Sequence, residues 1–159
     1  MDKVELVKAL HAQLEKEFQI LKTAALATYE DATHEESKPE NKYDTRALEA
    51  SYLAGAQAER VSDVAELIGI CRVLNVKKFS ESDPIAIGAL VEVESQEKTS
   101  FLFFLPKGGG VSFHYQNKKI QVITPTSPLG KAFLGMHASE TVTVQTGSQK
   151  RIYEINSVI

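Results

Sequence analysis

The sequence predicts an α+β protein, in which an N-terminal antiparallel hairpin of two long helices (a coiled coil) precedes an antiparallel β-sheet domain with one short helix. Three observations lead to this prediction. Apolar side chains recur at helical spacing through two stretches of the first half. A polar segment that contains Pro39 separates the two stretches. The second half changes to short β-rich runs separated by turns that contain glycine.

The composition narrows the possible functions. The chain of 159 residues can form one ordinary domain, or a small domain with an extended element. Its formal net charge of −3 argues against a protein that binds duplex DNA by itself. Cys71 is the single cysteine, so no intramolecular disulfide is possible, which fits a reducing compartment. Because no apolar run approaches ~18 residues and the start lacks a signal-peptide pattern, we expect a cytoplasmic protein without a membrane segment.

The first domain is predicted over residues 1–76. One helix is expected from about Asp2 to Glu30 and a second from about Asp44 to Arg72. Their apolar positions are Val7, Leu10, Leu14, Leu21 and Ala25 in the first helix, and Leu48, Tyr52, Ala58, Val61, Ala65 and Ile68 in the second. Two such stripes are buried most simply when the helices fold back on each other, which gives arms roughly 40 Å long. Residues 31–44 then form an acidic tip.

Residues 77–84 are predicted to be a linker and residues 85–159 a β domain. Strands are expected at 89–94, 99–105, 111–115, 119–123, 141–145 and 151–155. A short helix over 128–134 interrupts them, because Ser127 suits an N-cap, Pro128 suits the first turn and a glycine follows.

Three other features have simple structural interpretations. Residues 107–110, Lys-Gly-Gly-Gly, lack the spacing of a phosphate-binding loop and are interpreted as a turn. Cys71 is interpreted as a small core residue rather than a nucleophile. A cluster of aromatic residues is interpreted as sheet core rather than as a base-stacking platform, because no basic patch lies beside it in the sequence. These aromatic residues are Phe101, Phe103, Phe104 and Phe113.

The second half resembles a known family. The segment Ser127-Pro-Leu-Gly-Lys-Ala-Phe-Leu-Gly135, a Thr-Val-Thr-Val strand and a closing Tyr-Glu-Ile strand resemble the C-terminal domain of Gre-type (GreA/GreB) bacterial transcription elongation factors. The resemblance implies an FKBP-like fold and bacterial RNA polymerase as the partner, with nucleic acid reached only through the polymerase. It also implies that the loop with Ser127, Pro128 and Leu129 contacts a coiled coil at the rim of the polymerase secondary channel.

The tip resembles the family less closely. In the family, a tip with an Asp-x-x-Glu arrangement holds a magnesium ion in the polymerase active centre and promotes cleavage of backtracked RNA. Here Glu40 falls on the family glutamate, while Ser37 falls on the aspartate, with Glu36 beside it. Pro39 replaces the family lysine, and Tyr43 follows Glu40 one residue early, so the tip is shorter. The chain is therefore interpreted as a divergent branch of the family.

The tip carboxylates are the candidate catalytic and metal-binding residues. Magnesium prefers oxygen ligands, commonly one or two carboxylates with phosphate oxygens and waters, and two-metal sites cleave phosphodiesters. Glu36 and Glu40 are the expected pair, Glu35 is the substitute, and His34 is a candidate proton carrier. Two other interpretations stay open. The tip can regulate without cleavage, or it can be charged only because it is solvated.

The sequence therefore predicts a polymerase-binding elongation factor that inserts its hairpin into the secondary channel and can stimulate cleavage of backtracked RNA. We expect no catalytic activity of its own and no intrinsic cofactor, at most a magnesium ion shared with the polymerase. The alternative is a non-cleaving interaction protein that occludes the polymerase channel or another partner site. A self-associating hairpin is a third hypothesis, and prolyl isomerase activity is suggested by analogy of fold alone.

Overall fold

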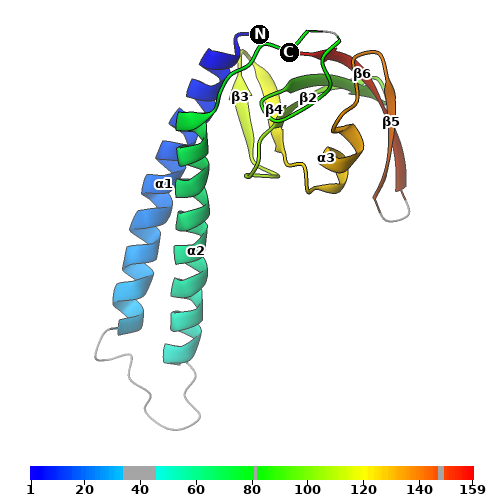
Figure 1. The fold of residues 1–159 in the computed structure, drawn as a ribbon. Helices are drawn as coiled ribbons and strands as arrows, with labels where there is room; N and C mark the ends of the chain where they lie inside the picture. The colour runs from blue at the N-terminus through cyan, green and yellow to red at the C-terminus, as the bar shows by residue number, and fades with distance from the viewer. Residues whose placement is uncertain (34–45, 81, 147–148) are drawn as a thin grey trace. The chain divides into compact units, whose positions relative to one another are not determined.

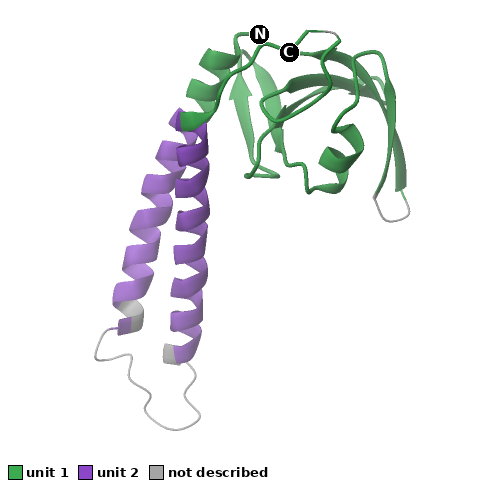
Figure 2. Cartoon of the chain, viewed as in Figure 1, with its two compact units in different colours: residues 1–10, 73–159 green, residues 11–72 purple. Residues whose placement is uncertain are grey.

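The computed structural model describes residues 1–33, 46–80, 82–146 and 149–159. Within these ranges the chain forms two compact units (Figure 2). Residues 1–10 with 73–159 make up the sheet unit, and residues 11–72 make up the hairpin unit. The first turns of the N-terminal helix thus belong to the sheet unit, whereas the sequence prediction placed all of residues 1–76 in the hairpin.

Two long helices form the predicted hairpin, α1 at Lys3–Thr33 and α2 at Arg46–Val73 (Figure 1). Buried apolar side chains of the hairpin unit are Leu14, Val64, Leu67, Ile68 and Cys71. Near the end of α2, Arg72 Nη2 lies 2.9 Å from Oε1 of Glu15 in the first half of α1, as an antiparallel pair requires. Exposed ion pairs of this kind contribute at most about 1 kcal/mol to stability. Burial of apolar side chains is therefore the main source of stability in the hairpin unit.

The described part of the second half forms one six-stranded sheet and one short helix, as the sequence predicts. The elements are β1 (Leu90–Ser95), β2 (Lys98–Phe104), β3 (Ser112–Tyr115), β4 (Lys118–Ile123), α3 (Pro128–Phe133), β5 (Thr141–Thr146) and β6 (Gln149–Val158). The strand order is β3-β4-β2-β1-β6-β5. The α+β class is therefore confirmed.

The sheet is mixed rather than wholly antiparallel. The strands β2 and β4 pair in parallel, with Phe101 opposite Ile120 and Phe104 opposite Ile123, while the other pairs are antiparallel. The chain leaves β2, makes β3, and returns through β4, which lies between β2 and β3. The chain reverses its direction between β2 and β3 and again between β3 and β4, so β2 and β4 run in the same direction. Local sequence patterns carry no information on this choice of neighbour.

Tight turns connect successive strands of the sheet unit. The β3–β4 turn has Gln116 and Asn117 at φ 49° and 60°, the positive values that a two-residue type I′ turn needs at both central positions. Gly108 and Gly110 have φ of 86° and 89°, and the Val111 amide donates to the Gly108 carbonyl at 3.1 Å. The turn predicted in the glycine-rich segment is therefore present.

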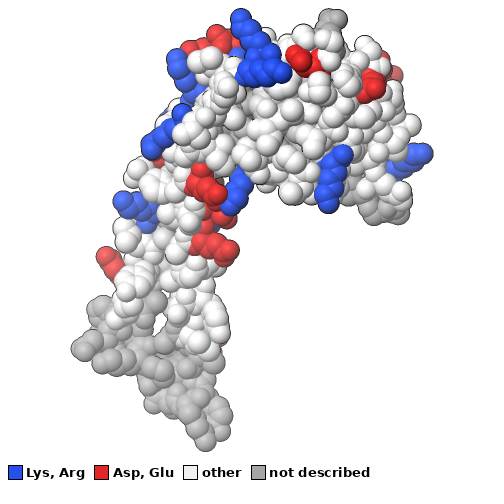
Figure 3. Space-filling model, viewed as in Figure 1, with Lys and Arg blue, Asp and Glu red and all other residues white. Residues whose placement is uncertain are grey.

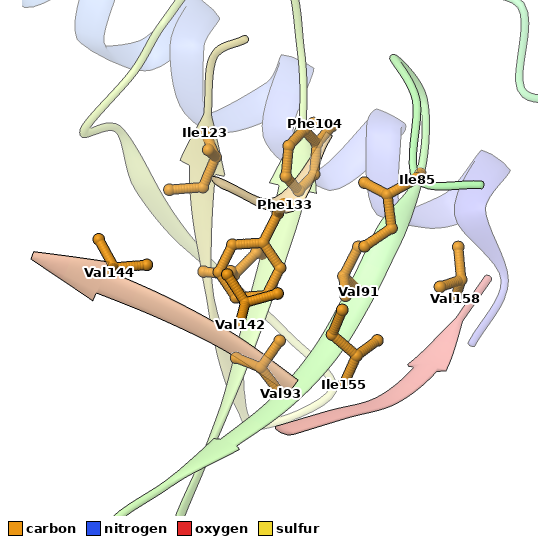
Figure 4. Close-up of a cluster of buried hydrophobic side chains, with 12 residues drawn as sticks. Ile85, Val91, Val93, Phe104, Ile123, Phe133, Val142, Val144, Ile155 and Val158 are labelled. Atoms are coloured by element: carbon orange, nitrogen blue, oxygen red, sulfur yellow. The ribbon is translucent and has the colours of Figure 1, made fainter. Parts of the chain in front are cut away.

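Aliphatic and aromatic side chains from the sheet and from α3 form the core of the sheet unit (Figure 4). Its members are Ile85, Ala89, Val91, Val93, Leu102, Phe104, Ile123, Phe133, Val142, Val144, Ile155 and Val158. Phe133 of α3 lies in the middle of this cluster and is 0% exposed. The phenylalanines at 101, 103, 104 and 113 are all buried, so they are sheet core and not a base-stacking platform.

No helix in the described ranges is both long and apolar enough to cross a membrane.

Candidate functional site

The predicted tip residues fall outside the described part of the chain. His34, Glu35, Glu36 and Glu40 all lie between residues 34 and 45, so their assignment as proton carrier and metal ligands stays a prediction. In the ranges that the structure describes, no group of three or more His, Cys, Asp or Glu side chains could hold a metal ion.

The predicted binding loop, in contrast, is described in full. Ser127 is the N-cap of α3, with extended backbone angles of φ −69° and ψ 154°. Its Oγ accepts a hydrogen bond from the Gly130 amide at 3.0 Å and donates one to the Thr124 carbonyl at 2.8 Å. The Ser127 amide donates to the same carbonyl at 3.0 Å. The serine therefore caps the helix, as predicted, and also closes the loop before it.

Gly130 gives this loop its second constraint. A Cβ built on Gly130 would lie 1.9 Å from the Thr124 carbonyl oxygen, a distance that no side chain can occupy. The glycine lets the first turn of α3 lie directly against the preceding loop. The close contact between Gly130 and Thr124 was not predicted from the sequence, although Gly130 stands inside the motif that carried the family resemblance.

The three predicted loop residues differ in how far solvent can reach them. Pro128 is exposed, whereas Ser127 and Leu129 are half-buried. Leu129 packs against the core cluster of the sheet unit, and Ser127 uses its hydroxyl within the loop. Pro128 is therefore the loop residue that is most available to a partner.

The sheet unit also contains a buried lysine that the sequence did not predict. Lys3 is 5% exposed, and its Nζ donates to the carbonyl of Lys77 and, at 3.1 Å, to that of Gly88. The same Nζ lies 4.4 Å from the ring centroid of Phe79. Burial, followed by the nearby charge of Lys77, lowers the pKa of Lys3 from 10.5 to about 8. Lys3 thereby fixes the first turn of α1 to the loops that lead into the sheet.

Comparison with known families identifies the kind of protein to which this loop belongs. The family model described as "Transcription elongation factor, GreA/GreB, C-term" matches residues 80–159, which contain the whole loop and the sheet. The chain belongs to the GreA/GreB family. The sequence resemblance in the second half is thereby confirmed.

Relatives of the GreA/GreB family extend the likeness to nearly the whole chain. Transcription elongation factor GreA of Nitrosococcus oceani is 25% identical over 166 residues, covering 99% of this chain and 98% of the relative. GreA of Rhodospirillum rubrum is also 25% identical, with the same coverage. Among solved structures, the GreA factor homolog 1 (Gfh1) protein of Thermus thermophilus is 19% identical at a TM-score of 0.39, covering 96% of both chains. A GreA/GreB factor from Nitrosomonas europaea is 17% identical at 0.36, covering 74% of this chain and 94% of that one.

Proposed function

We propose that this GreA/GreB family member binds bacterial RNA polymerase, inserts its hairpin into the secondary channel and regulates elongation. The observation that carries the proposal is the family match over residues 80–159. Two further features support it. The relatives that cover nearly the whole chain are named transcription elongation factors. The two helices, of 31 and 28 residues, are long enough for an arm of roughly 40 Å at ~1.5 Å per residue.

The loop at 127–129 is the proposed polymerase contact. The hydrogen bonds of Ser127 and the close approach of Gly130 to Thr124 hold the loop in one conformation. An ordered loop loses little conformational entropy when a partner binds, which favours affinity. Pro128 contributes an exposed apolar surface at the centre of the loop.

The tip is proposed to work in the polymerase active centre. Glu36 and Glu40, with Glu35 as substitute, supply carboxylate oxygens of the kind that magnesium prefers, so the donor set fits a shared ion. When bound, such an ion lowers the pKa of water and stabilises charge on phosphate oxygens. The carboxylates of this chain would hold the ion and orient water, and His34 would carry a proton.

A second candidate function is regulation without cleavage. Ser37 stands where the family has its tip aspartate, and Pro39 stands where it has a lysine. A serine hydroxyl is a neutral ligand, and loss of one carboxylate weakens binding of a divalent cation. In this case the chain would occupy the channel and change elongation through occlusion alone.

The test uses bacterial RNA polymerase halted in a backtracked complex with end-labelled RNA. The full chain is added with magnesium, shortened transcripts are measured, and co-elution with the polymerase is measured in parallel. The cleaving function predicts shortening that is lost in Glu36→Ala/Glu40→Ala but kept in Glu30→Ala, an exposed carboxylate at the end of α1. Binding without shortening would establish the occluding function. Absence of both would refute the proposal.

A further inference from the structure

The outer part of the hairpin unit carries an apolar groove between α1 and α2. The groove has a volume of about 280 Å³, and its large apolar residues include Leu26 and Tyr29 of α1, which are 52% and 60% exposed. Three alanines also line it, at positions 25, 54 and 58. Small side chains let another helix approach closely, so the groove can receive side chains from outside the chain.

The outer part of the hairpin has no core of its own. No side chain is buried in residues 15–30 and 48–63, all of which the structure describes. The buried apolar residues of the hairpin unit, such as Leu14 and Val64, lie farther from the tip. Because helices without tertiary packing are only marginally stable in water, this part of the hairpin gains stability from a surface that covers the groove.

The groove lies in a stretch of the hairpin without charge. Residues 23–29 of α1 and 50–58 of α2 contain no Asp, Glu, Lys or Arg. The hairpin surface that borders the grey residues in Figure 3 is accordingly mostly white. A nucleic-acid backbone is therefore a poor occupant, because phosphate recognition draws on several cations. An apolar protein surface fits the groove better.

Two opposite charges stand at equal distances on either side of Leu26. Lys22 lies four residues before it and Glu30 four residues after it, and both are exposed. Residues at four-residue steps lie along the same side of a helix, so the three form one row. When two such rows meet in antiparallel directions with Leu26 at the two-fold axis, Lys22 of each copy lies opposite Glu30 of the other. The row is therefore complementary to itself, as a two-fold interface requires.

We propose that the groove binds the same face of a second copy of this chain, in an antiparallel arrangement with the two-fold axis at Leu26. Leu26 and Tyr29 of each copy pack against the alanine-lined groove of the other, and Lys22 pairs with Glu30 of the second copy at both ends. A row of nine residues is only ~12 Å long, so the interface is small and the dimer reversible, with a dissociation constant on the order of 10 μM. The inference goes beyond the proposed function and needs no polymerase, so either can fail without the other.

The first experiment measures the dissociation constant of the dimer by sedimentation equilibrium of the full chain. Leu26→Asp is compared with Ile20→Asp, because Ile20 is 69% exposed on the same helix but lies about 120° around it from Leu26. Leu26→Asp is expected to weaken the dimer at least about tenfold, since it places two carboxylates together at the axis, and Ile20→Asp should stay within about twofold. Circular dichroism of the dilute monomers serves as the folding control.

A charge reversal tests the antiparallel register. Lys22→Glu is expected to weaken the dimer about fivefold or more at low salt, because it faces Glu30 of the second copy at both ends. The double variant Lys22→Glu/Glu30→Lys should return to within about twofold of the parent. Residues eight apart on one helix are not neighbours, so this recovery can only arise between two copies.

Three results would overturn the inference. The parent can stay monomeric at every concentration, Leu26→Asp can behave like Ile20→Asp, or the double reversal can stay as weak as Lys22→Glu alone. Each of these results would leave the proposed function standing.

Discussion

Gly130 lies so close to Thr124 that a Cβ on the glycine would stand 1.9 Å from the threonine carbonyl oxygen. This contact joins the loop after β4 to the first turn of α3. It explains why a glycine occurs at a helical position where it would otherwise reduce helix stability by about 1 kcal/mol relative to alanine. The exposed Pro128 owes its position to this contact and to the Ser127 cap.

Gly130→Ala should therefore destabilise the protein although alanine is the better helix former. The methyl group forces the Thr124 backbone to move, and overpacking of this kind costs about 1–3 kcal/mol or more. The free energy of unfolding, measured in urea, tests this. Gly69→Ala in α2 is the matched control, because nothing lies within 4 Å of its Cβ, and it should stabilise by about 0.5–1 kcal/mol. An equal response of the two variants would contradict the close contact.

Ser127→Ala should cost about 1 kcal/mol of stability, because the Gly130 amide loses its acceptor and the Thr124 carbonyl loses one donor. Ser127→Thr keeps a hydroxyl and should recover most of that loss. Ser127→Asp keeps only the acceptor and should recover less. Urea unfolding of the three variants gives the order, and an aspartate variant as stable as the parent would argue against the bond from Oγ to Thr124.

The lowered pKa of Lys3 predicts that the free energy of unfolding depends on pH in the alkaline range. Its pKa is about 8 in the folded protein and 10.5 in the reference state, so the unfolded chain binds more protons between these values. Stability carried by this group therefore rises as pH increases from about 8 to about 10.5, by about 3 kcal/mol at most. The free energy of unfolding of the parent should rise relative to that of Lys3→Met across this range.

The comparison with Lys3→Met is needed because another group titrates in the same range. Burial raises the pKa of Cys71 to about 11, so the stability that the protonated Cys71 thiol contributes is lost as pH rises. This change in stability has the opposite sign to the change expected from Lys3. Cys71 is present in both proteins, and its effect cancels in the difference between them. A difference that stays flat from pH 7 to pH 10 would show that Lys3 is not buried as a charged group.

Sequence patterns predicted the elements of this fold well, because the elements follow from local periodicity. The helical spacing gave α1 and α2 to within three residues at each end that the structure describes, and Ser127-Pro128 marked the start of α3. The parallel pairing of β2 with β4 could not be predicted, since it depends on which strand arrives beside β2.

The candidate site was predicted less completely for a related reason. Ser127, Pro128 and Leu129 were identified through their resemblance to a family motif. The roles of Gly130 and Thr124 depend on a contact between two backbones, which residue types do not reveal. Lys3 is a charged residue at the start of a helix, a position that usually predicts solvent exposure, and only the folded chain shows it buried against carbonyls. The tip residues Glu36 and Glu40 stay predictions.

The central claim is that this GreA/GreB family member binds RNA polymerase through the loop that begins α3. The most direct test is the dissociation constant for purified bacterial core polymerase, measured for the parent chain and for Pro128→Asp, with the folded state of both checked by thermal melts. We predict micromolar or tighter binding by the parent and a loss of at least about tenfold in the variant, because an anion would replace the exposed apolar surface of the loop. Equal binding by the two proteins, or no binding by the parent, would contradict the claim.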